Sequence, residues 1–207
     1  MRLNIKIISV ASTLVILLSA CGGGSGDGGV IPPSNTKSYL VSPLDGAKKI
    51  SLNYNQKIIA GYGCAAAEIY DSTGTKFENN ETFPKGDYTV VFHELFGRYS
   101  DSKGILYYRS SGILLNSMPV NQSISVPDRE AVLFQFILDS DKSFMISQSS
   151  VTYAIFDSTL KQVVSNSPFS PVYVSSGDSF DLKQGTYYIV GQPTYCTHSG
   201  SFTFTEL

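Results

Sequence analysis

The side chains that could support metal or acid–base chemistry are few in this chain. It has two histidines, His93 and His198, and two cysteines in its body, Cys64 and Cys196, with His198 only two residues after Cys196. A zinc site needs three or four such ligands in a fixed geometry, so these four form one only if the loops that carry them converge. The alternative is two ordinary loop histidines, and the sequence predicts no metal and no cofactor.

Nucleophilic catalysis is also weakly supported. The segment Gly177-Asp-Ser179 superficially resembles the start of a serine-esterase motif, but the nucleophile-elbow pattern G-x-S-x-G is absent. A serine nucleophile needs a base within reach, and the position three residues before His198 holds Tyr195 in place of an aspartate. We therefore expect no enzyme, with a hydrolase or metal site at His93 and His198 as the alternative.

One loop has the residue types of a recognition surface. The segment from His93 to Ser102 contains Arg98 and Tyr99, and Gln192–Tyr195 is its counterpart later in the chain. Tyrosine and arginine are enriched where binding energy concentrates, and loops on a rigid scaffold often carry function. The candidate binding residues are Arg98, Tyr99, Tyr195, His93 and His198; the alternative is that these loop aromatics pack on their own domain.

The N-terminus has the features of a secretion signal. Arg2 and Lys6 precede an apolar run from Ile7 to Leu18, which is signal-peptide length and too short to span a bilayer. The run ends in Leu18-Ser-Ala-Cys21, which resembles the lipobox of bacterial lipoproteins. That resemblance implies cleavage after residue 20 and lipidation of Cys21, including fatty acyl groups such as palmitate, because more than one chain is needed for stable anchoring.

The residues after the cysteine suggest where the anchor lies. Position 22 is glycine, whereas in the lipoprotein family an aspartate there resembles an inner-membrane retention signal, so the resemblance implies the bacterial outer membrane. Residues 22–37 read GGGSGDGGVIPPSNTK. Glycine and serine make this a flexible tether, and a coil of sixteen residues reaches roughly 20–25 Å. We expect residues 1–20 to be the signal peptide and 21–37 the lipidated tether.

Composition excludes some partners. The whole chain has 15 basic and 17 acidic residues; without Arg2 and Lys6 the balance is 13 against 17, or about −4. No basic cluster is present, so nucleic acid is a poor partner. Cys64 and Cys196 would lie in an oxidising compartment, and we expect them to be bridged; two buried free thiols are the alternative.

The body of the chain reads as β-structure. Short β-branched and aromatic runs alternate with Gly, Asp, Asn, Ser and Pro, and no window shows a helical period. Strands with turns every 8–12 residues predict sandwiches or barrels. The expected strands include 132–138, 143–146, 151–156, 186–190 and 201–205.

The chain also contains an internal repeat. Aligning Ile69 with Ile155 pairs Asp71-Ser with Asp157-Ser, and further on KGDYTVV (85–91) matches QGTYYIV (184–190). Each copy then has a glycine and a final strand. The second copy carries about 13 additional residues near 167–179, which we interpret as a loop insertion. Two copies of one β-module follow, covering residues 38–115 and 116–207.

The repeated motifs resemble the bacterial pre-peptidase C-terminal domain family. Residues 128–207 carry the resemblance best, through Ile155-Phe-Asp-Ser158, Gly185-Thr-Tyr-Tyr-Ile-Val190 and Gly200-Ser-Phe-Thr-Phe204. It implies small antiparallel sandwiches or jelly rolls, which in that family usually follow secreted proteases or polysaccharide-degrading enzymes and whose relatives bind collagen. No catalytic domain precedes them in this sequence.

The sequence therefore predicts an all-β protein of two tandem antiparallel sandwiches behind a lipid anchor. The function we expect is non-enzymatic binding of an envelope protein or an extracellular polymer through the end loops, and the membrane is the other expected partner. A purely structural envelope module is a further alternative.

Overall fold

The computed structural model describes residues 38–78, 81–95, 101–167, 170, 172–196 and 198–207. Within these ranges it is built almost wholly from strands, joined by two single-turn 3-10 helices, η2 (Pro43–Asp45) and η3 (Arg109–Ser111). None of the described helices has the length and apolarity to cross a membrane. The first seven strands are β1 (Leu40–Val41), β2 (Lys48–Leu52), β3 (Ile59–Gly61), β4 (Ala65–Asp71), β5 (Lys76–Phe77), β6 (Gly86–Glu94) and β7 (Gly104–Tyr107). The other eight are β8 (Ser123–Val126), β9 (Val132–Leu138), β10 (Lys142–Ser149), β11 (Val151–Phe156), β12 (Gln162–Ser165), β13 (Ser179–Leu182), β14 (Gly185–Pro193) and β15 (Gly200–Glu206).

The strands form four antiparallel sheets with a repeated topology. The first half contains the sheets β2-β6-β4-β5 and β1-β7-β3, and the second contains β9-β14-β11-β12 and β8-β15-β10-β13. The two halves therefore use the same strand order, with β13 as the one addition. That strand follows the region where the sequence predicts an insertion. The expected all-β sandwich architecture is confirmed.

Local hydrogen bonds repeat as well. The Asp71 carboxylate accepts bonds from the Thr73 amide and hydroxyl and from the Thr75 amide, and Asp157 binds its own turn through the corresponding atoms. The Tyr88 hydroxyl donates to the Pro84 carbonyl (2.7 Å), as Tyr187 does to Lys183 (2.9 Å). An aspartate that closes a strand-ending turn and a buried tyrosine with a partnered hydroxyl explain why these motifs recur.

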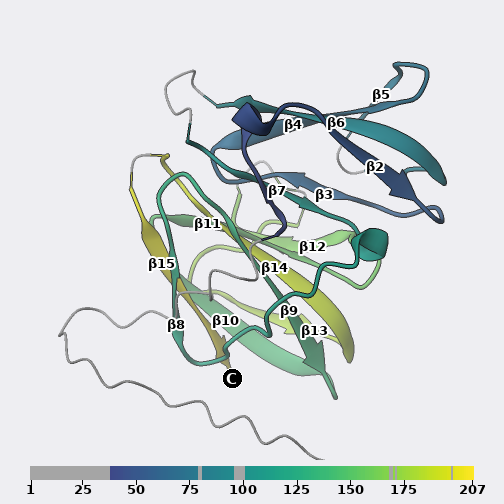
Figure 1. Cartoon of the computed structure of the whole chain (residues 1–207). Coiled ribbons are helices and arrows are strands. Elements are labelled where there is room, and N and C mark those ends of the chain that lie inside the picture. The colour runs from purple at the N-terminus through teal and green to yellow at the C-terminus, as the bar shows by residue number, and fades with distance from the viewer. Residues whose placement is uncertain (1–37, 79–80, 96–100, 168–169, 171, 197) are drawn as a thin grey trace, which may run out of the picture.

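The four sheets stack as successive layers, seen from top to bottom in Figure 1. Three apolar clusters fill the spaces between them: one inside the first sandwich, one inside the second, and one between the two. The last contains Ile105 and Tyr107 of β7 facing Leu133, Tyr188 and Val190 of β9 and β14. The two sandwiches therefore share a core, and the molecule is a single stack.

Stacking explains where the repeats differ. Aligning Gly104 with Gly200 pairs Ile105, which is fully buried between the sandwiches, with Ser201, which lies on the outer face of the last sheet. Likewise, Glu68 on the outermost sheet corresponds to Ala154 in the shared core. The same strand positions are apolar where another layer covers them and polar where none does, as terminal units of a stacked array require.

Candidate functional site

A tight turn connects β3 to β4 at the place where the two sandwiches meet. Its three residues Gly61, Tyr62 and Gly63 all have positive φ angles of 88°, 62° and 69°. A Cβ at position 63 would lie 2.5 Å from the Lys103 carbonyl oxygen and 3.2 Å from the Ala131 amide nitrogen. Position 63 therefore requires glycine both for its conformation and for close approach of the second sandwich. A non-glycine residue such as Tyr62 in this region indicates a backbone fixed by its surroundings.

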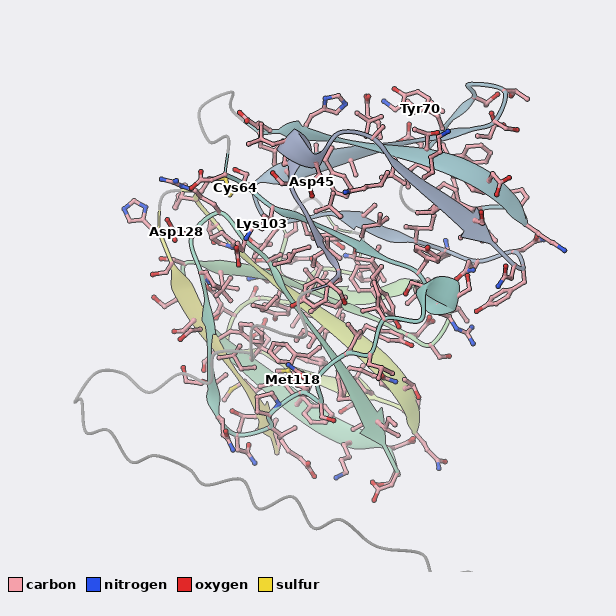
Figure 2. The ribbon with its side chains drawn as sticks, in the orientation of Figure 1. Asp45, Cys64, Tyr70, Lys103, Met118 and Asp128 are labelled. Atoms are coloured by element: carbon pink, nitrogen blue, oxygen red, sulfur yellow. A yellow bond between two sulfur atoms is a disulfide. The ribbon has the colours of Figure 1, made fainter. Side chains whose placement is uncertain are left out.

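Several contacts from both halves hold this turn. Cys64 forms a disulfide with Cys196 of the second sandwich, with 5.6 Å between the Cα atoms, so the expected bridge is confirmed. The Gly63 amide donates to the Gln192 side-chain oxygen (2.8 Å), and the Leu95 amide donates to the Cys64 carbonyl (3.0 Å). Figure 2 shows Cys64 on the side where the halves meet. The loops that follow β6 and β14 are thus both tied to one turn.

A groove of about 720 Å³ opens beside the turn and is lined by both sandwiches. Tyr62 stands in it, with its ring edge-on to Phe156 at a centroid distance of 6.0 Å. A smaller hollow of about 310 Å³, which is richer in hydroxyl side chains, shares Tyr62, Gln162 and Gln192 with the groove. The apolar lining side chains of the groove include Ile58, Tyr62, Leu95, Phe156, Leu160 and Val172.

The chemistry of the groove is that of recognition. Burial raises the pKa of Tyr62 to about 12, so its phenol is neutral at physiological pH. It offers an apolar ring and a hydroxyl that can donate or accept. The Gln162 side-chain amide donates to Ser170 (2.8 Å), and Gln192 is held by Gly63. The groove combines apolar side chains with polar groups held in fixed positions, and such a combination in a concave surface is typical of ligand sites.

The structure corrects the expected position of one histidine. His93 was assigned to a loop, but it lies within β6 and projects from the outer face of the outermost sheet. The β6 strand continues to Glu94 because its residues from Tyr88 onward pair with β4, where His93 is opposite Ala66. Its Nε2 atom is 3.0 Å from a Glu68 carboxylate oxygen. His93 therefore does not line the groove.

Glu68 is the centre of a small charged cluster on that outer face. Its carboxylate accepts hydrogen bonds from Lys76 (2.7 Å) and Tyr70 (2.8 Å) in addition to its contact with His93. The hydrogen bond from Lys76 is the largest of the effects that lower the pKa of Glu68 to about 2. A carboxylate held this firmly in its ionised form serves as an ion-pair partner; it is poorly suited to take up a proton as a general base at neutral pH.

The structure describes only some of the other residues that were expected from sequence to have a functional role. Tyr195 is 68% exposed, and its carbonyl accepts a bond from the His198 amide (3.3 Å), forming a turn around the disulfide. Arg98 and Tyr99 lie outside the described residues, as does the lipidation site Cys21. In the described part of the chain, no group of three or more His, Cys, Asp or Glu side chains could hold a metal ion.

Sequence reasoning missed Tyr62, Leu95 and Phe156 as site residues. Phe156 was expected only as part of a strand, because nothing in a single repeat shows that its outer face is covered by another sandwich. The signal that could have been used is Gly61-Tyr-Gly63 directly before Cys64. Two glycines around an aromatic residue, next to a cysteine, indicate a constrained turn from which the aromatic side chain projects.

Comparisons with known proteins identify no family for the chain. No family model matches it, and no curated protein matches it. Among solved structures, a match is the pre-peptidase C-terminal domain of a collagenase from Bacillus anthracis, with 16% identity and a TM-score of 0.32. The match covers 44% of this chain and 93% of that domain.

Proposed function

We propose that this chain is a lipid-anchored, non-enzymatic protein of the bacterial outer membrane that binds a protein partner. The observation that carries this proposal is the groove at the junction of the two sandwiches, which is lined by Tyr62 and by apolar side chains from both halves. The signal-like N-terminus and Cys21 support the anchoring, and the residues of the groove support the binding.

A polypeptide segment suits the groove better than a sugar polymer or an ionic ligand. Its apolar side chains would pack against Tyr62, Leu95 and Val172, and its amides would pair with glutamine side chains of the same chemistry. The charged lining residues are Lys57, Lys161 and Glu78, which are of mixed sign and favour no strongly charged ligand. This proposed site differs from the one expected from sequence, because His93, Tyr195 and His198 are not among the residues that line the groove.

Peptide selection tests this function. The full mature chain would be produced in an oxidising compartment with Cys21→Ser, so that it is soluble, and a displayed peptide library would be selected on it. We expect enriched peptides with apolar residues whose affinity falls at least tenfold on Leu95→Glu, because the introduced carboxylate would lose water on binding. Leu95 is 36% exposed, so the change leaves the core intact.

The matched control is Leu114→Glu, which makes the same change at a leucine that is 86% exposed and lies outside the groove lining. Its affinity for the selected peptides should equal that of the parent. A selection that yields no peptides, or peptides bound equally well by the Leu95→Glu protein, would refute the proposal. Collagen, peptidoglycan and neutral polysaccharides would be screened in parallel, and groove-dependent binding of one of these would replace the peptide as ligand.

A further inference from the structure

The outer face of the last sheet, β8-β15-β10-β13, is covered with hydroxyl side chains. Along β15 the buried Phe202 and Phe204 alternate with Ser201, Thr203 and Thr205, and the other strands follow the same alternation. Nine of the eleven outward positions on this sheet are serine or threonine. We call this surface the hydroxyl face; its members are Ser123, Ser125, Ser143, Met145, Ser147, Ser149, Ser179, Asp181, Ser201, Thr203 and Thr205.

Strand register arranges these hydroxyls in rows. Thr203 is opposite Ser123 on one side and Ser147 on the other. The neighbouring row is formed by Ser201 between Ser125 and Ser149. Adjacent strands in a sheet lie about 4.8 Å apart, and alternate residues along a strand are roughly 6.5–7 Å apart. The face is therefore a two-dimensional lattice of hydroxyl groups.

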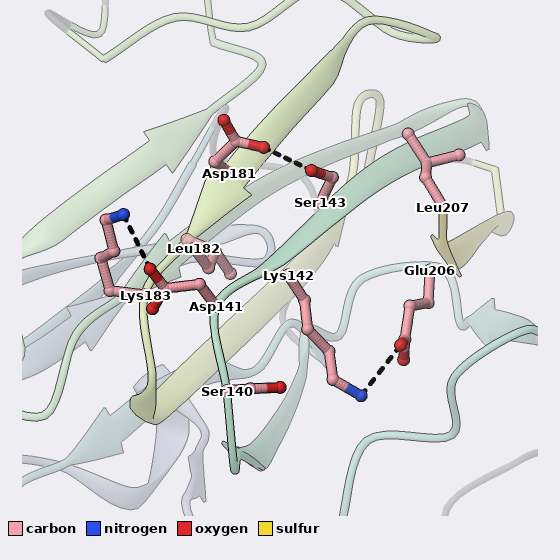
Figure 3. Close-up of a pocket in the computed structure, with 9 residues that line it drawn as sticks. All are labelled: Ser140, Asp141, Lys142, Ser143, Asp181, Leu182, Lys183, Glu206 and Leu207. Carbon is pink, nitrogen blue, oxygen red and sulfur yellow. Dashed lines mark hydrogen bonds and ion pairs between the residues drawn. The ribbon is translucent and has the colours of Figure 1, made fainter.

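Most of these hydroxyls are not used by the protein itself. Among the described residues, Ser143 is the member whose hydroxyl bonds another side chain, donating to Asp181 (2.5 Å), as Figure 3 shows. Charges at the same end of the sheet are compensated in pairs, Lys183 with Asp141 and Lys142 with Glu206, each at 2.8 Å. In the described part of the chain, the face thus presents mostly hydroxyls that no protein side chain bonds, and little net charge.

The need for a polar outer layer does not explain this composition. The opposite outer face, on β2-β6-β4-β5, meets the same need with ionisable residues, and Glu68, Lys76 and His93 form a cluster there. The hydroxyl face contains one ionisable side chain among its eleven, Asp181. Strands in general favour threonine over lysine and glutamate, but the opposite outer sheet of this molecule carries both of these charged residues. The contrast within one molecule points to a ligand.

We propose that the hydroxyl face binds a neutral polysaccharide. Each serine or threonine hydroxyl offers one donor and two acceptor sites, and sugar hydroxyls have the same dual character, so either partner can donate. A face with a single carboxylate, Asp181, does not repel such a polymer and does not favour an anionic one. Individual contacts are weak, but a repeating polymer meets a repeating lattice, and linked contacts add through their high effective concentration. This site is separate from the junction groove.

The test is retention of the soluble Cys21→Ser protein on insoluble neutral polysaccharides (chitin, cellulose and a β-1,3-glucan), with alginate as an anionic comparison. One row of hydroxyls is removed by Ser123→Ala, Thr203→Val and Ser147→Ala together, which preserves strand shape. We expect binding to at least one neutral polymer and a loss of at least tenfold in this variant. Ser51→Ala with Thr89→Val is the control, because it makes one change of each kind on the opposite face, where Ser51 donates to Asp87 (2.6 Å).

Thermal unfolding of each variant shows whether it is folded. If the first row variant does not fold, the adjacent row (Ser125→Ala, Ser201→Ala and Ser149→Ala) takes its place. Leu95→Glu should retain polysaccharide binding, which separates this site from the groove. Absence of binding to all neutral polymers, equal binding by the folded row variants, or binding to alginate alone would overturn the proposal.

Discussion

At the scale of single residues, Glu68 links stability to pH. Its pKa in the folded protein, about 2, lies below its ordinary value because Lys76, Tyr70 and His93 bond the carboxylate. A carboxyl group with a lowered folded-state pKa stabilises the protein above its unfolded-state pKa, near 4.3, and this contribution disappears as pH falls toward 2. Glu68→Gln should therefore unfold at lower urea concentration than the parent at pH 7, with the difference shrinking below pH 4. A difference that stays constant down to pH 2.5 would show that the cluster does not hold the charge.

The repeated tyrosines make a second prediction at this scale. Tyr88→Phe and Tyr187→Phe each remove one hydrogen bond from a tyrosine hydroxyl to a backbone carbonyl four residues earlier. Each change should lower the free energy of unfolding by about 1 kcal/mol, and by a similar amount in the two sandwiches. Chemical denaturation of both variants measures this. A loss in one copy and none in the other would mean that the two bonds are not equivalent.

At the scale of strands, the two copies differ where stacking covers one and exposes the other. Ile105→Ser should cost about 3 kcal/mol, as expected when a fully buried aliphatic side chain is removed from a core. The reciprocal Ser201→Ile on the outer face should change stability by less than about 0.5 kcal/mol. Denaturation of the two variants compares them directly. Equal effects would contradict the assignment of Ile105 to a core between the sandwiches.

Strand positions were largely predictable from sequence, because alternation of apolar and polar residues reports one buried face. Residues 132–138 and 151–156 form strands with the expected ends. The stacking of the sandwiches was not predictable in the same way. Leu133, Phe156 and Tyr188 face the core between the sandwiches, whereas the apolar residues next to them in sequence face the core inside the second sandwich. A strand that is buried on both faces loses its alternation of apolar and polar residues. His93 was misplaced for a related reason: strand pairing with β4 extends β6 beyond the local sequence pattern.

At the scale of the whole molecule, the disulfide and the shared core should make unfolding cooperative. Cys64 and Cys196 are separated by 132 residues, and a crosslink of that span contributes up to about 5 kcal/mol in the chain-entropy model. Cys64→Ser with Cys196→Ser should lower the midpoint of unfolding while keeping one transition for both sandwiches. Calorimetry of the parent, with and without reductant, is the control, and the reduced parent should match the double variant. Two separate transitions would show that the sandwiches are independent.

The central functional claim is that a polypeptide segment binds in the groove between the two sandwiches. It is tested most directly by titrating a selected peptide into the isotopically labelled Cys21→Ser protein and following backbone amide signals by NMR. We predict saturable shifts concentrated at Tyr62, Gly63, Leu95, Gln162 and Gln192, with the hydroxyl face undisturbed. Shifts confined to other surfaces, or no shifts at peptide concentrations well above the measured Kd, would contradict it.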